Sequence, residues 1–119
     1  MPDDYDQLCR TWDPWGCIPA EYNLGVALTR GQVEQGRGGK TALLWENAAG
    51  ESRAFTYAQL DALSSRFASA LAGLGVGCGD RVFLRLPNRP EFYVAALAVA
   101  KLGGVFIPSS TQFHEAEVR

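Results

Sequence analysis

The chain has few of the residues that metal and redox sites need. Among its 119 residues are one histidine, His114, and three cysteines, Cys9, Cys17 and Cys78. The cysteines are far apart, and a single histidine cannot complete the ligand spacing of a zinc site. We therefore expect no metal site, and we expect free thiols in a reducing compartment.

Clustered positive charge is also absent. Eleven Lys and Arg residues stand against 13 Asp and Glu residues, which gives a net charge of −2. The basic residues are scattered along the chain, whereas nucleic-acid binders gather them on one face to neutralise phosphates. The sequence therefore predicts no nucleic-acid partner.

No apolar run is long enough to span a membrane. The most apolar stretch runs from Phe92 to Ile107 and is interrupted by Lys101, whereas a spanning helix needs about 20 residues. The opening MPDDYDQLCRTWDPW is acidic and aromatic, without the basic-then-apolar order of a signal peptide. We therefore predict a cytoplasmic protein with no membrane span.

Composition and length indicate a single small unit. Hydrophobic residues make up 47% of the chain and charged residues 20%, which are ordinary values for a soluble domain. Residues 1–22 contain Trp12 and Trp15 among several aromatic residues and show little periodicity. We expect this segment to be an aromatic arm that lies against a larger body, with the domain itself in residues 23–119.

Hydrophobic periodicity predicts helices that alternate with strands. In order, we expect a weak helix from Asn23, strands in TALLWE and RAFTY joined by a hairpin, a helix that Thr56 and Gln59 begin as a capping box, a strand in RVFLRL, a helix from Pro90 to Leu102, a strand in VFIP, and one helical turn in FHEAEVR. This order indicates βαβ units and a parallel sheet with helices on both faces. The predicted fold class is α/β, the beginning of a layered helix–sheet–helix domain that is incomplete, with RVFLRL and VFIP as neighbouring parallel strands.

Two predicted helices differ in how much of their surface is apolar. The helix after Thr56 carries an apolar stripe of Leu60, Leu63, Phe67, Leu71 and Leu74, and its opposite face carries Gln59, Asp61, Ser65, Arg66 and Ser69. The helix at 90–102 is apolar almost all round. Such a helix must be covered on several sides.

The stretch GRGGKT, at Gly36 to Thr41, looks like a phosphate-binding loop. That loop requires a glycine five residues before its Gly-Lys-Thr, and the residue at that position is Glu34. A phosphate loop also follows a strand and opens a helix, whereas here a predicted helix precedes and a strand follows. The glycines of GLGVGCGD fail a dinucleotide fingerprint in the same way, because Cys78 or Asp80 stands where the third glycine should be. We predict that both stretches are turns between elements.

Three segments stand out when their order and spacing are taken together: Phe55-Thr56-Tyr57 with Leu60, then Gly79-Asp80-Arg81-Val82, then Ala98 to Pro108. They resemble the opening of adenylate-forming enzymes, the superfamily of acyl-CoA synthetases, peptide-synthetase adenylation domains and luciferases, with Gly104 in place of the common alanine. The similarity runs from about residue 40 to residue 119. The segments LPNRPEF and IPSSTQF look more like the acyl-CoA synthetase branch than the peptide-synthetase branch.

The resemblance implies a two-step ligase that joins a small-molecule carboxylate to coenzyme A. ATP and Mg²⁺ would first form an acyl-adenylate, and coenzyme A would then displace AMP. In that family the ATP loop and the catalytic lysine lie further along, so the resemblance implies no catalytic, cofactor-binding or metal residue in this chain. Lys101 belongs to a helix end, where a cation complements the helix dipole. Asp80 and Arg81 are read as turn and strand residues, and His114 as a solvated residue in a first helical turn.

Two hypotheses from different classes remain open. The first is the N-terminal fragment of an AMP-forming acid–CoA ligase, inactive by itself, whose last predicted helix has about one turn where 10–14 residues are usual. The alternative is a stand-alone α/β interaction module that binds a protein partner through its aromatic arm and apolar helix. A monomer that melts cooperatively would favour the second hypothesis.

The phosphate-loop reading can be tested directly with Lys40→Ala. Because the loop lacks the first glycine and the helix that would follow it, we expect no ATP binding by the unmodified chain and none to lose in the variant. Isothermal titration with Mg-ATP measures this, and saturable binding that Lys40→Ala abolishes would restore the phosphate-loop interpretation.

Overall fold

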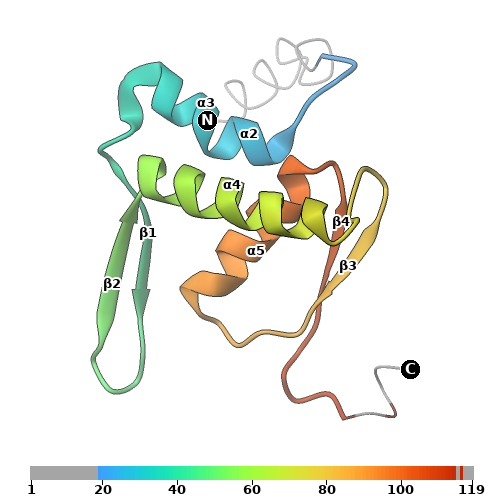
Figure 1. Cartoon of the computed structure of the whole chain (residues 1–119). Coiled ribbons are helices and arrows are strands. Elements are labelled where there is room, and N and C mark those ends of the chain that lie inside the picture. The colour runs from blue at the N-terminus through green and yellow to red at the C-terminus, as the bar shows by residue number, and fades with distance from the viewer. Residues whose placement is uncertain (1–18, 115, 117–119) are drawn as a thin grey trace, which may run out of the picture.

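The computed structural model describes residues 19–114 and residue 116. In chain order the elements are α2 (Leu24–Leu28), α3 (Arg30–Gln32), the π-helix η1 (Val33–Arg37), β1 (Thr41–Glu46), β2 (Ser52–Thr56), α4 (Tyr57–Gly73), β3 (Arg81–Leu84), α5 (Pro90–Lys101) and β4 (Val105–Pro108). Helices α4 and α5 form the centre, with the hairpin β1–β2 at one end and the pair β3–β4 at the other (Figure 1). None of the described helices has the length and apolar character needed to cross a membrane.

The predicted hairpin is confirmed. Strands β1 and β2 pair antiparallel, and their register shifts between Thr41 and Leu43. In the turn, the Asn47 side-chain oxygen accepts hydrogen bonds from the backbone N–H groups of Ala49 and Glu51, at 3.0 and 2.9 Å. An Asn side chain that holds the backbone in this way favours a tight turn. The second strand ends one residue earlier than predicted, since Tyr57 is already helical.

The predicted βαβ unit is also confirmed. Strands β3 and β4 are parallel neighbours, with Arg81 opposite Val105 and Leu84 opposite Pro108, and α5 connects them. Pro90 occupies the first turn of α5, where its missing N–H costs nothing. The chain therefore has the mixed helix and strand architecture that the sequence predicts.

Helix α4 begins at the predicted capping box. The Thr56 hydroxyl accepts from the Gln59 backbone N–H at 3.2 Å, and the Gln59 side-chain oxygen accepts from the Thr56 N–H at 2.9 Å. These two bonds satisfy groups that a helix start leaves without intrahelical partners. The helix then continues to Gly73.

The predicted apolar stripe of α4 is not the face that is most buried. The buried residues of this helix are Leu60, Ser64 and Ala68, whereas Phe67 is 40% exposed and Leu74 is 82% exposed. Small residues allow α4 and α5 to approach closely, and the Ser64 hydroxyl is satisfied by the Leu60 carbonyl at 2.6 Å. In the packed structure α4 is therefore turned about its own axis, so that part of its apolar stripe lines a hollow.

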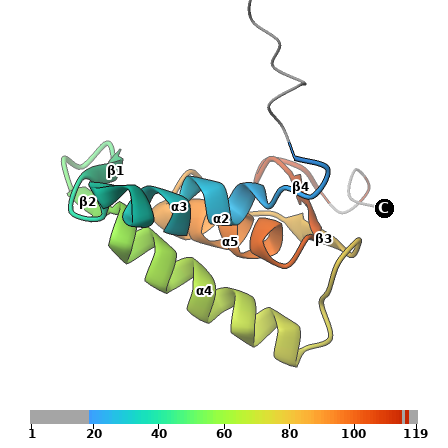
Figure 2. The ribbon, with the colours of Figure 1, turned by 90° about the horizontal axis from the view of Figure 1, so that it is seen from above.

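Helix α5 lies between α4 and α2 (Figure 2). Its residues Ala98 and Val99 are fully buried, and Ala95 is 4% exposed. This agrees with the expectation that so apolar a helix needs cover on more than one side. Its N-terminal half is more open, with Tyr93 39% exposed.

Helix α2 meets the C-terminal end of α5 at Asn23 and Gly25. Asn23 caps α2, as predicted, by accepting from the Val26 N–H at 2.9 Å. Its side-chain amide also donates to the Lys101 carbonyl at 2.9 Å, so one residue caps two helices. A Cβ on Gly25 would lie 2.6 Å from the Lys101 backbone nitrogen and 2.8 Å from the Leu97 carbonyl oxygen. The approach of the two helices therefore requires glycine.

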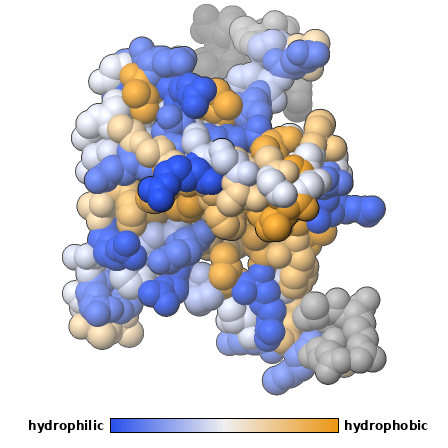
Figure 3. Space-filling model, viewed as in Figure 1, coloured by the Kyte–Doolittle hydropathy of each residue, from blue (hydrophilic) through white to orange (hydrophobic). Residues whose placement is uncertain are grey.

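Large apolar side chains are exposed over much of the described surface. Thirteen of them are exposed, whereas the buried hydrophobic residues number six, three of which are alanines. Apolar surface gathers where α4, β3 and β4 meet on the face shown in Figure 3. Contiguous exposed apolar patches mark surfaces that contact something else.

Two predicted segments fall mostly outside the described residues. The aromatic arm at 1–22 is described only from residue 19, where no helix or strand is present. Of the predicted helical turn in FHEAEVR, Phe113, His114 and Ala116 are described; Ala116 is helical and the other two are not. The arm and the boundary at residue 23 remain predictions.

Substituting Gly25 with Ala tests the contact between α2 and α5. The added methyl group would overlap backbone atoms, so we expect a loss of about 1–3 kcal/mol in the free energy of unfolding. Gly31→Ala is the matched control, since the nearest atom to its Cβ is 3.4 Å away and alanine favours a helix by about 0.5–1 kcal/mol. Urea unfolding of both variants gives the comparison, and equal stabilities would show that the contact is not tight.

Candidate functional site

The GRGGKT segment serves as a cap for helix α4. The Tyr57 N–H donates to the Lys40 carbonyl at 3.1 Å, and the Ala58 N–H donates to the Gly38 carbonyl at 3.0 Å. With the Gln59 N–H held by Thr56, the first three N–H groups of α4 are occupied. Groups of this kind bind phosphate where they are free at a helix N-terminus. The predicted position between a helical segment and a strand is confirmed, and these N–H groups are not available to a nucleotide.

A polar cluster joins the C-terminal end of α5 to α4 and α3. The Lys101 ammonium contacts the Asp61 carboxylate at 2.6 Å, the Ser65 hydroxyl at 2.9 Å and the Asp61 carbonyl at 3.2 Å. The side chain of Lys101 is 8% exposed and that of Asp61 is 20% exposed. Arg30 lies at the rim, 3.9 Å from the second carboxylate oxygen of Asp61 and more than half exposed.

The pKa of Asp61 lies below its ordinary value. Partial burial by itself raises that pKa, but the hydrogen bond and the charge of Lys101, the Thr29 hydroxyl and the charge of Arg30 together outweigh burial. A cation within hydrogen-bond distance stabilises the ionised carboxylate. The Asp61 carboxylate is therefore charged at neutral pH. Its pairing with Lys101 is that of a structural ion pair.

The position of Asp61 and Ser65 corrects the sequence reading. Hydrophobic periodicity predicts both on the face of α4 opposite its apolar stripe, yet both are half-buried and bind Lys101. Lys101 lies at the end of α5, as predicted, although α5 stops one residue before the predicted Leu102. Its ammonium reaches across to α4. The signal that could have located this cluster is that Lys101 is the single charge in an otherwise apolar segment.

The other singled-out residues do not assemble into a site. The Asp80 carboxylate accepts from the Gly77 N–H at 2.8 Å, which holds the turn before β3, and Arg81 is the first residue of that strand. Cys78 is an exposed free thiol, and His114 is exposed. Within residues 19–114 and 116, no group of three or more His, Cys, Asp or Glu side chains could hold a metal ion. Cys9 and Cys17 lie outside the described residues.

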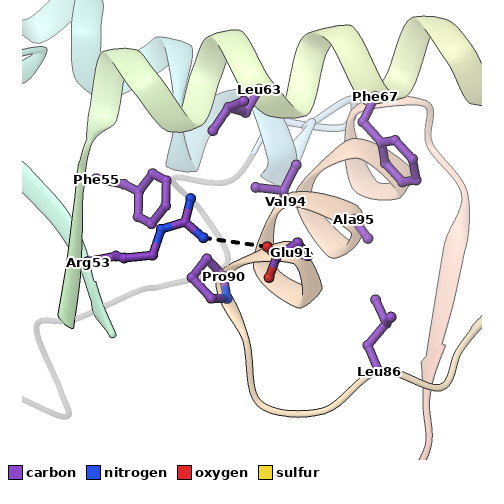
Figure 4. A pocket seen from close by; sticks show the side chains of 9 residues that line it. All are labelled: Arg53, Phe55, Leu63, Phe67, Leu86, Pro90, Glu91, Val94 and Ala95. Carbon is purple, nitrogen blue, oxygen red and sulfur yellow. Dashed lines mark ion pairs between the residues drawn. The ribbon is translucent and has the colours of Figure 1, made fainter. Parts of the chain in front are cut away.

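An apolar hollow of about 390 Å³ opens between β2, α4 and α5 (Figure 4). Its lining residues are Arg53, Phe55, Leu63, Phe67, Leu86, Pro90, Glu91, Val94 and Ala95. Apart from Arg53 and Glu91 these side chains are apolar, so the hollow can hold an apolar group but contains no nucleophile activated by a base. The sequence alone does not predict this hollow, because it depends on how α4 is rotated against α5.

Ion pairs between charged side chains lie at the edge of the hollow. Arg53 lies 3.6 Å from one Glu91 carboxylate oxygen, and Arg89 lies 3.7 Å from the other. The Arg53 guanidinium also lies 5.1 Å from the centre of the Phe55 ring, a distance at which a cation is attracted by the ring face. All three charged side chains are about half exposed, so their contacts orient the hairpin more than they stabilise it.

Comparison with known proteins decides which family this scaffold represents. The model of the family described as AMP-binding enzyme matches residues 30–119. The chain belongs to this family. The acetyl-coenzyme A synthetase of Rubrobacter xylanophilus is 44% identical over 108 residues, which are 84% of this chain and 16% of that protein. The family resemblance stated from the sequence is therefore confirmed.

Solved structures of the family share the arrangement of elements. The acetoacetyl-CoA synthetase from Streptomyces lividans superposes with a TM-score of 0.72 at 33% identity, over 81% of this chain and 15% of that chain. An acyl-CoA synthetase from Brucella canis gives a TM-score of 0.84 over 96% of this chain and 22% of that chain. Its identity is 22%, so it shows the fold alone.

The chain spans only part of its relatives. It corresponds to 14–16% of the length of the first three curated proteins that it matches. The three segments that carried the resemblance lie at the start of α4, at the start of β3 and across the end of α5 into β4.

Replacing Lys101 with Met tests whether the polar cluster holds the helices together. The variant keeps the apolar stem of the side chain but leaves a partly buried carboxylate without its closest partner, so we expect a loss of about 1–3 kcal/mol in unfolding free energy. Arg30→Met is the control, because an exposed ion pair contributes at most about 1 kcal/mol. Denaturant unfolding at pH 7 measures both, and equal effects would contradict the central role of Lys101.

The same variant gives a pH dependence of defined sign. Because the folded pKa of Asp61 is depressed, its stabilising effect is complete above the ordinary value of 3.8 and is lost as the pH falls through the lower folded value. The stability difference between the unmodified chain and Lys101→Met should therefore be constant from pH 5 to pH 7 and shrink below pH 3.8. A difference that stays constant at acidic pH would show that the ion pair is not its source.

Proposed function

We propose that this chain is the first part of the N-terminal domain of an AMP-forming acid–CoA ligase and that it is inactive by itself. The observation that carries the proposal is the family match over residues 30–119 in a chain that spans 14–16% of its curated relatives. The relatives named acetyl-coenzyme A synthetase and acetoacetyl-CoA synthetase support the choice of reaction class.

The reaction of such a ligase has two steps. A carboxylate oxygen of the substrate attacks the α-phosphorus of ATP, and pyrophosphate leaves, which gives an acyl-adenylate. The sulfur of coenzyme A then attacks the acyl carbon, AMP leaves, and the thiol proton is released. Activation is needed because AMP is a stable leaving group and an oxide ion is not. The enzyme supplies positioning and charge compensation on the phosphoryl oxygens.

The described residues support a scaffold role in that reaction. The helix start nearest to a phosphate-like motif has its N–H groups occupied by loop carbonyls, and the buried lysine is paired with a carboxylate. ATP, Mg²⁺ and coenzyme A would therefore be held by residues outside this segment. A cytoplasmic ligase that uses a small carboxylate fits the reducing compartment that the sequence predicts.

The exposed apolar surface favours the fragment over the stand-alone interaction module. More large apolar side chains are exposed than buried in the described part of the chain. A self-sufficient domain of this size covers most of such surface in its own core. The interaction module would instead melt cooperatively as a soluble monomer.

The proposal predicts that activity depends on the rest of the ligase. The isolated chain should show no ATP–pyrophosphate exchange with acetate. A chimera in which the 119-residue chain replaces the matching opening segment of the Rubrobacter xylanophilus acetyl-coenzyme A synthetase should form acetyl-CoA, because the two segments are 44% identical.

The unmodified synthetase is the control for the chimera. Exchange activity by the isolated chain would place catalytic residues inside it and would refute the proposal. A chimera that folds but forms neither adenylate nor thioester would refute it as well.

A further inference from the structure

An apolar groove of about 360 Å³ lies where the segment before α2 meets the end of α5 and the start of β4. We call it the α2–β4 groove. Its large apolar side chains, which are between 38% and 60% exposed, are those of Tyr22, Leu24, Val105 and Phe106. Residues from the two ends of the described chain thus form one apolar surface that the described residues leave open.

Part of the α2–β4 groove is lined by backbone rather than by side chains. Gly103 and Gly104 line it, and glycine lets another group approach the backbone closely. Within the described residues β4 pairs with β3 alone, so carbonyl groups along the other edge of β4 can accept hydrogen bonds. Apolar walls, an accessible backbone and carbonyl acceptors together fit an indole, which is flat and apolar and carries one N–H donor.

The chain itself supplies an indole close to the groove. Trp15 precedes the first described residue, Pro19, by four positions. An extended chain spans at most about 3.6 Å per residue, so Trp15 can lie no farther than about 14 Å from Pro19. The backbone bends at Ala20 and Glu21, directly before Tyr22, which lines the groove. The N-terminal segment is therefore short enough, and enters at the right place, to bring Trp15 to the groove.

Charge favours the same segment. Residues 1–18 contain four Asp residues and one Arg residue, and one of these Asp residues, Asp13, lies two positions before Trp15. Beside the groove, Arg81 lies opposite Val105 in the register of β3 and β4 and is exposed. An exposed pair of opposite charges contributes little free energy, at most about 1 kcal/mol, but it favours one orientation of the segment.

We propose that Trp15 of the chain's own N-terminal segment occupies the α2–β4 groove, where its ring packs against Val105 and Phe106 and over the backbone of Gly103 and Gly104. The inference does not depend on the proposed function, because it concerns how the chain covers its own surface. It also names the surface on which the predicted aromatic arm lies.

Thiol labelling at residue 105 tests the inference in the full 119-residue chain. Val105→Cys places a small thiol in the groove, and modification by iodoacetamide is followed on the tryptic peptide of residues 102–119, which contains none of the natural cysteines. We expect labelling to become at least about fivefold faster when Trp15→Ser is added, because the thiol loses its cover. Equal rates with and without Trp15 would overturn the inference.

Two matched variants serve as controls for the labelling. Trp12→Ser removes the other tryptophan of the segment, and we expect it to leave the rate at residue 105 unchanged. Leu44→Cys places a thiol on β1, where Leu44 is 77% exposed, and its rate should be the same with and without Trp15. If Trp12→Ser accelerates labelling at residue 105 while Trp15→Ser does not, or if Trp15→Ser accelerates it equally at residue 44, the inference fails.

Tryptophan fluorescence measures the same contact from the side of the indole. The chain has three tryptophans, so Trp12→Phe with Trp45→Phe leaves Trp15 as the single indole. We expect its quenching constant with acrylamide to rise about twofold when Phe106→Ser removes one wall of the groove. The matched chain that keeps Trp12 as its single indole should not respond to Phe106→Ser. Unchanged quenching of Trp15 would contradict the proposal.

Sedimentation at the labelling concentration separates the remaining outcomes. A monomer with a protected residue 105 supports the inference. A dimer that Trp15→Ser dissociates would mean that the segment of one copy occupies the groove of another, and the inference would fail. Labelling of residue 105 that is as fast in buffer as in urea would also overturn it. Ligase activity of the chimera does not enter these measurements, so refutation of the proposed function leaves their result unchanged.

Discussion

The arrangement of the helices depends on the last residue of α5. The backbone of Lys101 meets Gly25 at a distance that excludes any side chain there, and its carbonyl accepts from Asn23. Its ammonium leaves α5 sideways and binds Asp61 and Ser65 on α4. A single residue thus fixes α2, α4 and α5 relative to one another, in a cluster where every polar group has a partner. Breaking such a pair leaves a partly buried charge uncompensated, which is why it constrains the packing strongly.

The rest of the packing is built on small residues. The buried residues of α4 and α5 include Ser64, Ala68, Ala95 and Ala98, while larger side chains such as Phe67 line an open hollow. Little apolar area is gained at such a contact, because alanine and serine bury few carbon atoms. This distribution fits a segment whose large side chains are covered by other parts of a longer enzyme, and it agrees with the proposed function.

The glycine-rich stretch shows why a motif requires its structural context. In GRGGKT the carbonyls of Gly38 and Lys40 accept hydrogen bonds from the first two backbone N–H groups of α4. Gly36 adopts a positive φ of 81° inside η1, where it interrupts the helical backbone, a conformation that other residues rarely adopt. The residues that suggest phosphate binding therefore cap a helix and reverse the chain. The missing first glycine of the motif already indicated that they do not bind phosphate.

Sequence by itself determined the local elements and the family. The capping box at Thr56, the hairpin turn and the proline at the start of α5 depend on residues close together in the chain, and local patterns record such features well. The parallel pairing of β3 with β4 was predictable from the order strand, helix, strand. Only the tertiary structure decided the rotation of α4 and the partner of Lys101. Asp61 lies 40 positions away, and its contact follows from the angle and distance at which two helices pack. Periodicity identifies an apolar stripe, but the face that is buried depends on which neighbour can approach most closely.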